Sequence, residues 1–185
     1  MKRGWMIILI LVLTALACSL GGGGQGGGGG APDGQGEPDA NSSGVKPEAP
    51  EIAAGDCSAS PGPGVNYAKC DLTGQNFSDA DFSGATLAQA ILSNSNFANT
   101  NFTDANLAWV FASETSLLNA NFMNADLTGA DMRESNLINA NFTNAITIGV
   151  DFSGSNMTGA TITDEQLDQA FSVKGAVLPD GSFGK

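Results

Sequence analysis

The fold is decided by a run of ten residues, Ala125-Asp126-Leu127-Thr128-Gly129-Ala130-Asp131-Met132-Arg133-Glu134, which contains two groups of five built on one plan. In each group a small residue stands first, an acidic residue second and a large apolar residue third. The same register divides residues 65–164 into twenty groups of five, and eighteen of the twenty third positions are large and apolar. The first position is Ala in ten groups, so small and large apolar residues alternate along the whole stretch.

This period indicates a solenoid. It is neither the 3.6-residue period of an amphipathic helix nor the two-residue period of a half-buried strand. In a solenoid each short unit buries its apolar side chains only against neighbouring units. Residues twenty apart also share their chemistry, which supports four groups of five in each coil. Examples are Phe82, Phe102, Phe122 and Phe142 in one series and Ala85, Ala105, Ala125 and Ala145 in another.

The repeat resembles the A-[DN]-L-x-x pattern of the pentapeptide-repeat family, and residues 125–134 match that pattern almost letter for letter. The resemblance implies an all-β solenoid, a right-handed quadrilateral β-helix of about five coils over residues 65–164. It also implies that first-position and third-position side chains point inward. On this fold Asn76, Asn96, Ser116, Asn136 and Asn156 would form a nearly continuous ladder of stacked amides along one side.

Both open ends of such a stack need covering, because they would otherwise expose unpaired backbone groups. At the C-terminal end, Thr163-Asp164-Glu165-Gln166 has the form of a capping box and predicts a short capping helix within the cap 165–185. Leu167, Ala170 and Phe171 would share one face of that helix and cover the last coil. At the other end, residues 57–64 are expected to form an N-terminal cap segment.

The N-terminus has the features of an export signal followed by a tether. Residues 1–17 combine a short basic start with an apolar stretch that is too short to span a bilayer. Cys18 follows Ala17, as at a lipoprotein processing site, so we expect a lipid on Cys18 that anchors the chain at the cell membrane or outer envelope surface. The alternative is an ordinary A-x-A cleavage site and secretion. Residues 18–56 contain the lipid-anchor Cys and a Gly/Pro-rich tether predicted to be disordered.

The number of cysteines, three, is consistent with one lipid-modified cysteine and one disulfide. If Cys18 carries lipid, Cys57 and Cys70 remain as a candidate disulfide, since exported proteins rarely keep a free thiol. Because Cys70 occupies an inward-facing first position, two buried free thiols are the alternative.

Composition excludes several functions. The net charge of −12 argues against nucleic acid as a partner, and the absence of histidine removes the commonest catalytic and metal-binding side chain. Asp71, Asp131 and Asp151 share one side of the solenoid, but no calcium-loop motif accompanies them. We therefore predict no catalytic residues, no metal and no cofactor, and conclude that the protein is not an enzyme.

The strongest candidates for a partner contact are apolar residues at outward positions. Ile91, Trp109, Phe111, Leu118 and Ile138 break the polar pattern, and exposed aromatic clusters commonly mark interfaces. They could instead fold over a side of the solenoid or lie beneath a terminal segment. The expected function is thus a non-catalytic, envelope-anchored binding or scaffolding module that contacts an unknown protein or a second copy of itself. An acidic mimic of DNA that inhibits an enzyme such as gyrase is the alternative, which the export signal disfavours.

Overall fold

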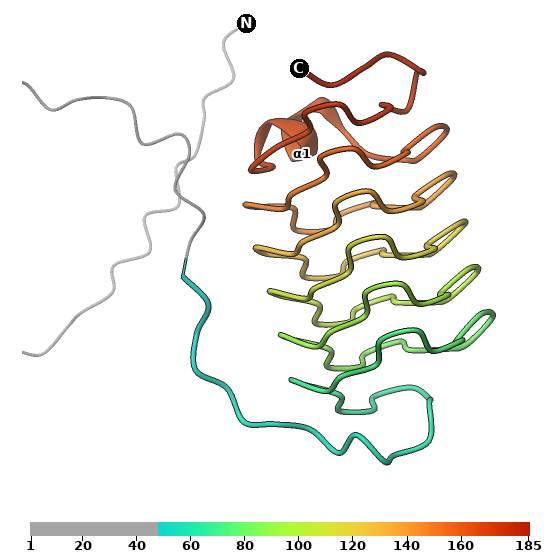
Figure 1. The fold of residues 1–185 in the computed structure, drawn as a ribbon, viewed down its shortest axis with the longest axis vertical. Helices are drawn as coiled ribbons and strands as arrows, with labels where there is room; N and C mark the ends of the chain where they lie inside the picture. The colour runs from blue at the N-terminus through green and yellow to red at the C-terminus, as the bar shows by residue number, and fades with distance from the viewer. Residues whose placement is uncertain (1–47) are drawn as a thin grey trace, which may run out of the picture. The chain divides into compact units, whose positions relative to one another are not determined.

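The structure is a computed structural model that describes residues 48–185. The predicted signal 1–17, the predicted lipid site Cys18 and residues 18–47 of the predicted tether lie outside the described residues. In the part that is described, the chain winds into stacked coils (Figure 1).

The coils are joined by parallel bridges between second-position residues twenty apart, from Asn66 with Thr86 to Asn141 with Thr161. At each bridge the backbone bonds run in both directions. The Tyr67 N–H donates to the Thr86 carbonyl at 2.7 Å, and the Thr86 N–H donates to the Val65 carbonyl at 2.9 Å. In residues 48–185 each bridge is isolated, because a turn follows after every pair of extended residues. The twenty-residue repeat predicted from the sequence is confirmed.

The turns depend on the fifth position of each group. The first-position N–H closes the turn on the preceding third-position carbonyl, as between Ala85 and Phe82 at 3.0 Å, in every turn from 67 to 160 except the one at Ala112–Thr115. All nineteen fifth positions from 69 to 159 have positive φ, which type II turns require at their third residue. Six of these positions are Gly, six are Asn and two are Asp, the residues that best tolerate this conformation.

The core is a stack of inward third-position and first-position side chains, as expected from the sequence. The rings of Phe82, Phe102, Phe122 and Phe142 are fully buried, and successive ring centroids lie 5.7, 5.2 and 5.1 Å apart. Such offset aromatic pairs add to the free energy gained by burying the rings. Small alanines at first positions leave room for these rings inside a narrow coil.

The amide ladder predicted from Asn76 to Asn156 forms only in part. Asn96 donates to Asn76 at 3.0 Å, but Ser116 then interrupts the series. Beyond Ser116, Asn136 and Asn156 stand in consecutive coils, but the Asn156 Oδ1 accepts from the Thr158 N–H and hydroxyl at 3.1 and 2.7 Å. The prediction of a nearly continuous ladder was therefore wrong, because Ser116 interrupts it and Asn156 bonds within its own turn. A longer ladder runs through Asp81, Asn101, Asn121 and Asn141 on another side.

The segment before the first repeat covers the N-terminal edge. The Gly55 and Asp56 N–H groups donate to the Ala68 and Asn66 carbonyls at 2.7 and 2.9 Å, so they occupy acceptors that the first coil leaves open. Cys57 and Cys70 form a disulfide, with Cα atoms 5.4 Å apart. The disulfide links this segment to the first coil. The predicted pairing of Cys57 with Cys70 is therefore confirmed, and the alternative of two buried free thiols is wrong.

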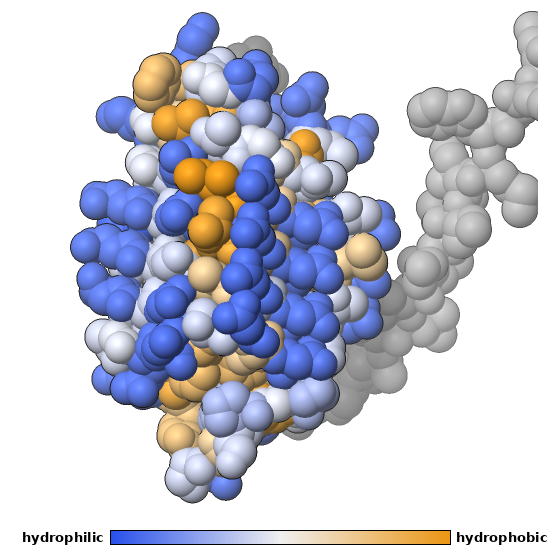
Figure 2. Space-filling view, turned by 90° about the vertical axis from the view of Figure 1, so that its right-hand side faces the viewer, coloured by the Kyte–Doolittle hydropathy of each residue, from blue (hydrophilic) through white to orange (hydrophobic). Residues whose placement is uncertain are grey.

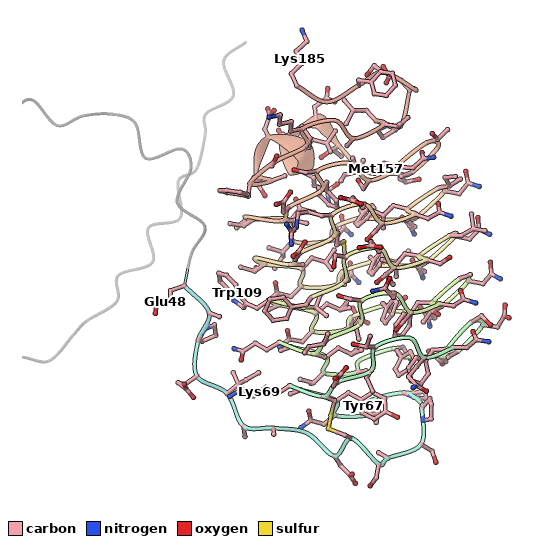
Figure 3. All side chains as sticks on the ribbon, in the orientation of Figure 1. Glu48, Tyr67, Lys69, Trp109, Met157 and Lys185 are labelled. Atoms are coloured by element: carbon pink, nitrogen blue, oxygen red, sulfur yellow. A yellow bond between two sulfur atoms is a disulfide. The ribbon has the colours of Figure 1, made fainter. Side chains whose placement is uncertain are left out.

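Further upstream, the same segment lies along one corner of the solenoid. Glu51 approaches Lys69 at 3.8 Å, and the side-chain amide of Gln89 donates to the Pro50 carbonyl. Figure 3 shows Glu48, Lys69 and Trp109 along this edge.

The C-terminal end carries the one helix of the described region, α1 (Asp164–Asp168). Its predicted capping box is present between Thr163 and Gln166. Ala170 and Leu167 pack partly against the core, but Phe171 lies beyond the helix and is 44% exposed. The expectation that Phe171 covers the last coil was wrong, because α1 ends too early to place it on the same face.

After α1 the chain resumes the stack one residue out of register. Asp151 pairs with Ser172 and Asn156 pairs with Val177, in each case twenty-one residues apart. Val177 then pairs in the antiparallel direction with Phe183, which closes the edge. At five residues α1 is too short to cross a bilayer, and no other helix occurs in residues 48–185.

Candidate binding surface

Two columns of outward second-position side chains occupy opposite sides of the solenoid. The Asn column consists of Asp81, Asn101, Asn121 and Asn141, and the Phe111 column consists of Asp71, Ile91, Phe111, Asp131 and Asp151. Their backbones pair with neighbouring coils in the same way: the Asn121 and Phe111 N–H groups each donate to the preceding coil at 2.9 Å. The two columns therefore differ in side chains and not in how their coils pair.

The polar side chains of the Asn column are hydrogen-bonded to one another. Asn101 donates to Asp81 at 2.9 Å, Asn121 donates to Asn101 at 3.3 Å, and Asn141 donates to Asn121 at 2.9 Å. The same side-chain oxygens also accept from backbone N–H groups two residues ahead, as the Asn101 Oδ1 does from the Thr103 N–H at 3.1 Å. This column is a structural element, since its polar groups have partners within it and within its own turns.

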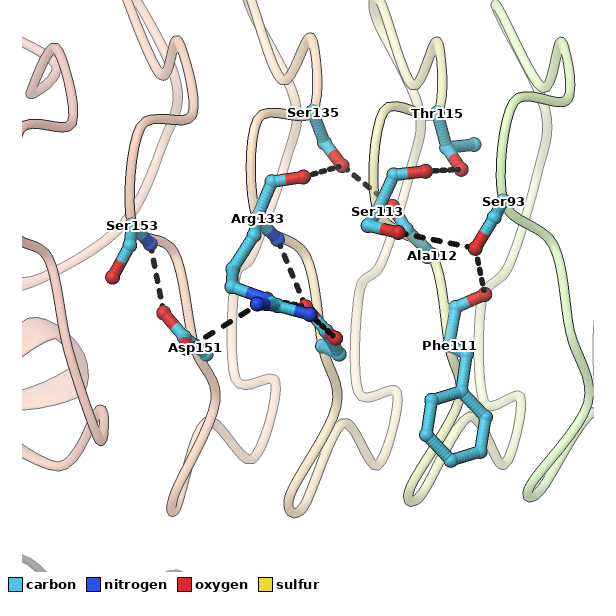
Figure 4. A network of polar contacts seen from close by, with 10 residues as sticks. Ser93, Phe111, Ala112, Ser113, Thr115, Arg133, Ser135, Asp151 and Ser153 are labelled. Carbon is cyan, nitrogen blue, oxygen red and sulfur yellow. Dashed lines mark hydrogen bonds and ion pairs between the residues drawn. The ribbon is translucent and has the colours of Figure 1, made fainter.

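The Phe111 column leaves two large apolar side chains in solvent. Ile91 and Phe111 pair across one coil step and are 38% and 49% exposed. Beside them, the hydroxyls of Ser93 and Ser113 lie 3.1 Å apart, and the Ser93 hydroxyl also reaches the Phe111 carbonyl at 3.4 Å (Figure 4). The Phe111 ring projects away from this network, so its position depends on no polar contact of its side chain.

Above Phe111, the column carries an ion pair. Arg133 donates to both oxygens of Asp131 at 2.8 and 2.7 Å and lies 4.0 Å from Asp151 (Figure 4). The hydrogen bonds and the charge of Asp131 raise the pKa of Arg133 above its usual value, with smaller contributions from Asp151 and Glu134. The guanidinium occupies the place between two carboxylates that a cation would need, and no group of three metal-binding side chains occurs in residues 48–185.

Carboxylates surround the apolar pair. Asp71 lies one coil before Ile91, where hydrogen bonds from the Thr73 side chain and backbone lower the pKa of its carboxyl. Glu114 and Glu134 stand exposed at the next corner, in fifth positions of consecutive coils. Glu114 was not predicted as a site residue, although its twenty-residue spacing from Glu134 in the sequence places both glutamates at one corner.

Trp109 lies at the corner before Phe111, in the same left-handed conformation as the other fifth positions, with φ of 62°. This φ is unusual for a bulky residue. Its ring lies against Gly129 of the next coil, where a Cβ atom would come within 2.6–2.8 Å of three ring carbons. Trp109 is therefore half-buried against the solenoid and only borders the exposed pair.

Leu118 and Ile138 stack on the adjacent side, as predicted, but both are half-buried. The structure thus brings Ile91 and Phe111 together and keeps Leu118 and Ile138 apart from them. Two further isoleucines, Ile146 and Ile148, are 44% and 49% exposed on another side.

One face of the solenoid is drawn in Figure 2. On this face a short stripe of hydrophobic residues lies between columns of hydrophilic residues.

Taken together, the repeat and the surface define a β-solenoid made of five-residue units. The pentapeptide-repeat family profile matches residues 68–104, 80–117, 100–137 and 135–170, with eight copies of its repeat. The chain belongs to the pentapeptide-repeat family, whose members form right-handed quadrilateral β-helices. None of the curated proteins matches the sequence.

Several solved structures are similar. A pentapeptide repeat protein (Rfr23) from the cyanobacterium Cyanothece 51142 is 25% identical with a TM-score of 0.45, over 54% of this chain and 65% of that one. A pentapeptide repeat protein from the Arabidopsis thaliana thylakoid lumen is 24% identical with a TM-score of 0.38, over 63% and 81%. QnrB1, a plasmid-mediated fluoroquinolone resistance protein, is 16% identical with a TM-score of 0.37, over 58% and 67%. This chain therefore spans about two thirds of the length of the Cyanothece protein.

Proposed function

We propose that this protein is a non-catalytic binding or scaffolding module that is held at the cell envelope and displays a rigid pentapeptide-repeat solenoid. One observation carries the proposal. Ile91 and Phe111 are exposed on a backbone that has the same parallel bridges as the Asn column, so the bridges do not require these side chains. Exposed large apolar side chains without a structural role are typical of contact surfaces.

The architecture suits such a role. In this proposal the solenoid comprises five coils over residues 65–164, with caps at 57–64 and 165–185. Its core of stacked phenylalanines and its bonds between successive coils hold surface side chains at fixed spacing. A preorganised surface loses little conformational entropy on binding.

Attachment at the envelope is proposed from the sequence of the N-terminal segment. Residues 1–17 would direct export, Cys18 would carry the lipid, and the Gly/Pro-rich residues that follow would give the solenoid reach from the membrane. The disulfide between Cys57 and Cys70 agrees with an oxidising compartment.

The anchor is tested by expressing the full chain in a bacterial host, fractionating the cells and measuring the mass of the mature N-terminus. We expect the protein in the membrane fraction with an acylated Cys18, and the Cys18→Ser variant outside that fraction. An unmodified Cys18 on a secreted chain would contradict the anchor and leave the binding surface open to its own test.

The binding surface is tested by capture of partners from a solubilised native envelope. The parent chain is compared with the Ile91→Ser/Phe111→Ser double variant and with Thr143→Ala, a control on the side of the Asn column. We expect the double variant to lose a partner that the parent and the control retain, while thermal unfolding of all three stays cooperative. Equal capture by all three proteins would contradict the proposal.

A further inference from the structure

We propose that the Phe111 column binds a basic peptide segment of a partner protein. Apolar side chains of the segment would pack on Ile91 and Phe111, and its lysine or arginine side chains would pair with the carboxylates around them. The inference rests on the proposed function and adds the chemistry of the partner.

The apolar centre of the site is small. Ile91 and Phe111 stand in neighbouring coils, which lie about 4.8 Å apart as paired strands do. Ser93 and Ser113 beside them are occupied with each other. A centre of this size accommodates one or two apolar side chains, which fits a short segment better than the broad apolar face of an obligate dimer.

Acidic groups lie on both sides of this centre along the solenoid. Asp71 precedes Ile91 by one coil, and Asp131 and Asp151 follow Phe111. Glu114 and Glu134 add two exposed carboxylates at the neighbouring corner.

The basic groups nearby leave this side negative. Arg133 is held on Asp131, and Lys69, two residues before Asp71, lies 3.8 Å from Glu51. Lys174 lies beyond Gly154 towards the C-terminal end. Five carboxylates therefore face one arginine and one lysine around the centre, and Glu51 also pairs with that lysine. This potential attracts a basic partner and repels an anionic membrane surface.

The charges also argue against a second copy as the occupant. Two solenoids facing each other in opposite directions about a two-fold axis could place Ile91 of one copy on Phe111 of the other. The same register would then bring Asp71 of each copy beside the Asp131–Arg133 ion pair of the other, while Asp151, Glu114 and Glu134 keep both facing surfaces negative. Two surfaces of the same sign weaken an interface.

The test is a fluorescence anisotropy titration of the full chain at about 0.15 M salt, where long-range attraction is largely screened. The probes are a labelled octapeptide with alternating lysine and leucine or phenylalanine, and the same peptide with glutamate in place of lysine. We expect the lysine probe to bind and the glutamate probe not to bind. Binding of both probes, or of neither, overturns the inference.

Two double variants separate specific binding from general attraction to an acidic protein. Ile91→Ser/Phe111→Ser leaves the charge unchanged, and we expect it to weaken binding at least tenfold. Glu114→Gln/Glu134→Gln is expected to weaken binding several-fold. Its matched control, Glu165→Gln/Asp168→Asn, also removes two negative charges, but from exposed positions of α1. We expect this control to leave the affinity for the lysine probe unchanged.

Equal losses in the two charge variants, or no loss in the apolar variant, would overturn the inference. So would sedimentation showing that the parent chain dimerises and that the dimer excludes the probe. If the probe fails while capture from the envelope still depends on Ile91 and Phe111, only the basic character of the partner is wrong and the proposed function stands.

Discussion

The Asn column and the Phe111 column occupy the same position of the repeat on opposite sides of the solenoid. Both are paired through the same backbone bridges every twenty residues. In the Asn column, side chains bond to one another from coil to coil. In the Phe111 column, the two central side chains are apolar and are 38% and 49% exposed to solvent.

This difference separates what the fold needs from what it merely tolerates. A coil is complete once its inward side chains, its turns and its backbone bonds are in place. The Asn column strengthens the fold further, whereas Ile91 and Phe111 add exposed apolar area that costs solubility. Departures from the repeat therefore indicate function more clearly than the repeat itself.

The largest effect is expected from comparing two phenylalanines. Phe102→Ala, in the core behind the Asn column, should lower the free energy of unfolding by about 3–5 kcal/mol through loss of buried area and creation of a cavity. Phe111→Ala should cost about 1 kcal/mol or less, because half of its side chain is already in water. Urea unfolding measures both free energies. Similar losses of stability in the two variants would contradict the claim that Phe102 is structural and Phe111 is not.

Gly129 and Gly84 offer the next comparison, since both are fifth-position glycines with positive φ. Alanine at either position costs about 1–2 kcal/mol for the left-handed conformation. At Gly129 the added Cβ would also overlap the Trp109 ring, which adds about 1–3 kcal/mol of overpacking, while nothing lies within 4 Å at Gly84. Gly129→Ala should also shift the fluorescence of Trp109, the only tryptophan outside residues 1–17, and Gly84→Ala should leave it unchanged.

Substitutions of outward side chains in the two columns should change the free energy of unfolding by less. Asn121→Ala should cost about 1–2 kcal/mol, because it removes bonds to Asn101, Thr103 and Asn141. Phe111→Asn, which imposes the family's polar residue on the other column, should change stability by about 0.5 kcal/mol or less. Thermal unfolding of the two variants is the measurement, and a larger loss at position 111 would mean that Phe111 has a structural role.

The smallest expected effect is the change of folding stability with pH, to which one aspartate from each column should contribute in the same direction. Hydrogen bonds from Ser83 lower the pKa of Asp81, and those from Thr73 lower the pKa of Asp71. A carboxyl whose pKa is depressed in the folded state stabilises the protein above its unfolded pKa of about 3.9, and this contribution disappears as the pH falls through the folded value. Stability should therefore hold from pH 8 to 5 and decline below about pH 4. NMR titration showing either carboxyl at or above its usual pKa would contradict the assignment.

The sequence predicted the fold well because the repeat encodes it directly. The inward phenylalanines and alanines, the twenty-residue stacking, the capping box at Thr163 and the disulfide pair are all present in the structure. What the sequence could not supply was how far each outward side chain is exposed. Trp109, Leu118 and Ile138 looked equivalent to Phe111 in the sequence, but their exposure depends on neighbours in adjacent coils and corners, such as Gly129 beneath the Trp109 ring.

The central claim is that the Phe111 column contacts a partner and the Asn column does not. It is tested most directly by placing a photo-crosslinking amino acid at position 111 or at Thr143, which is also exposed and lies on the side of the Asn column. Irradiation of the native envelope should give a discrete adduct from position 111 and none from position 143. The same adducts from both positions, or none from either, would contradict the account.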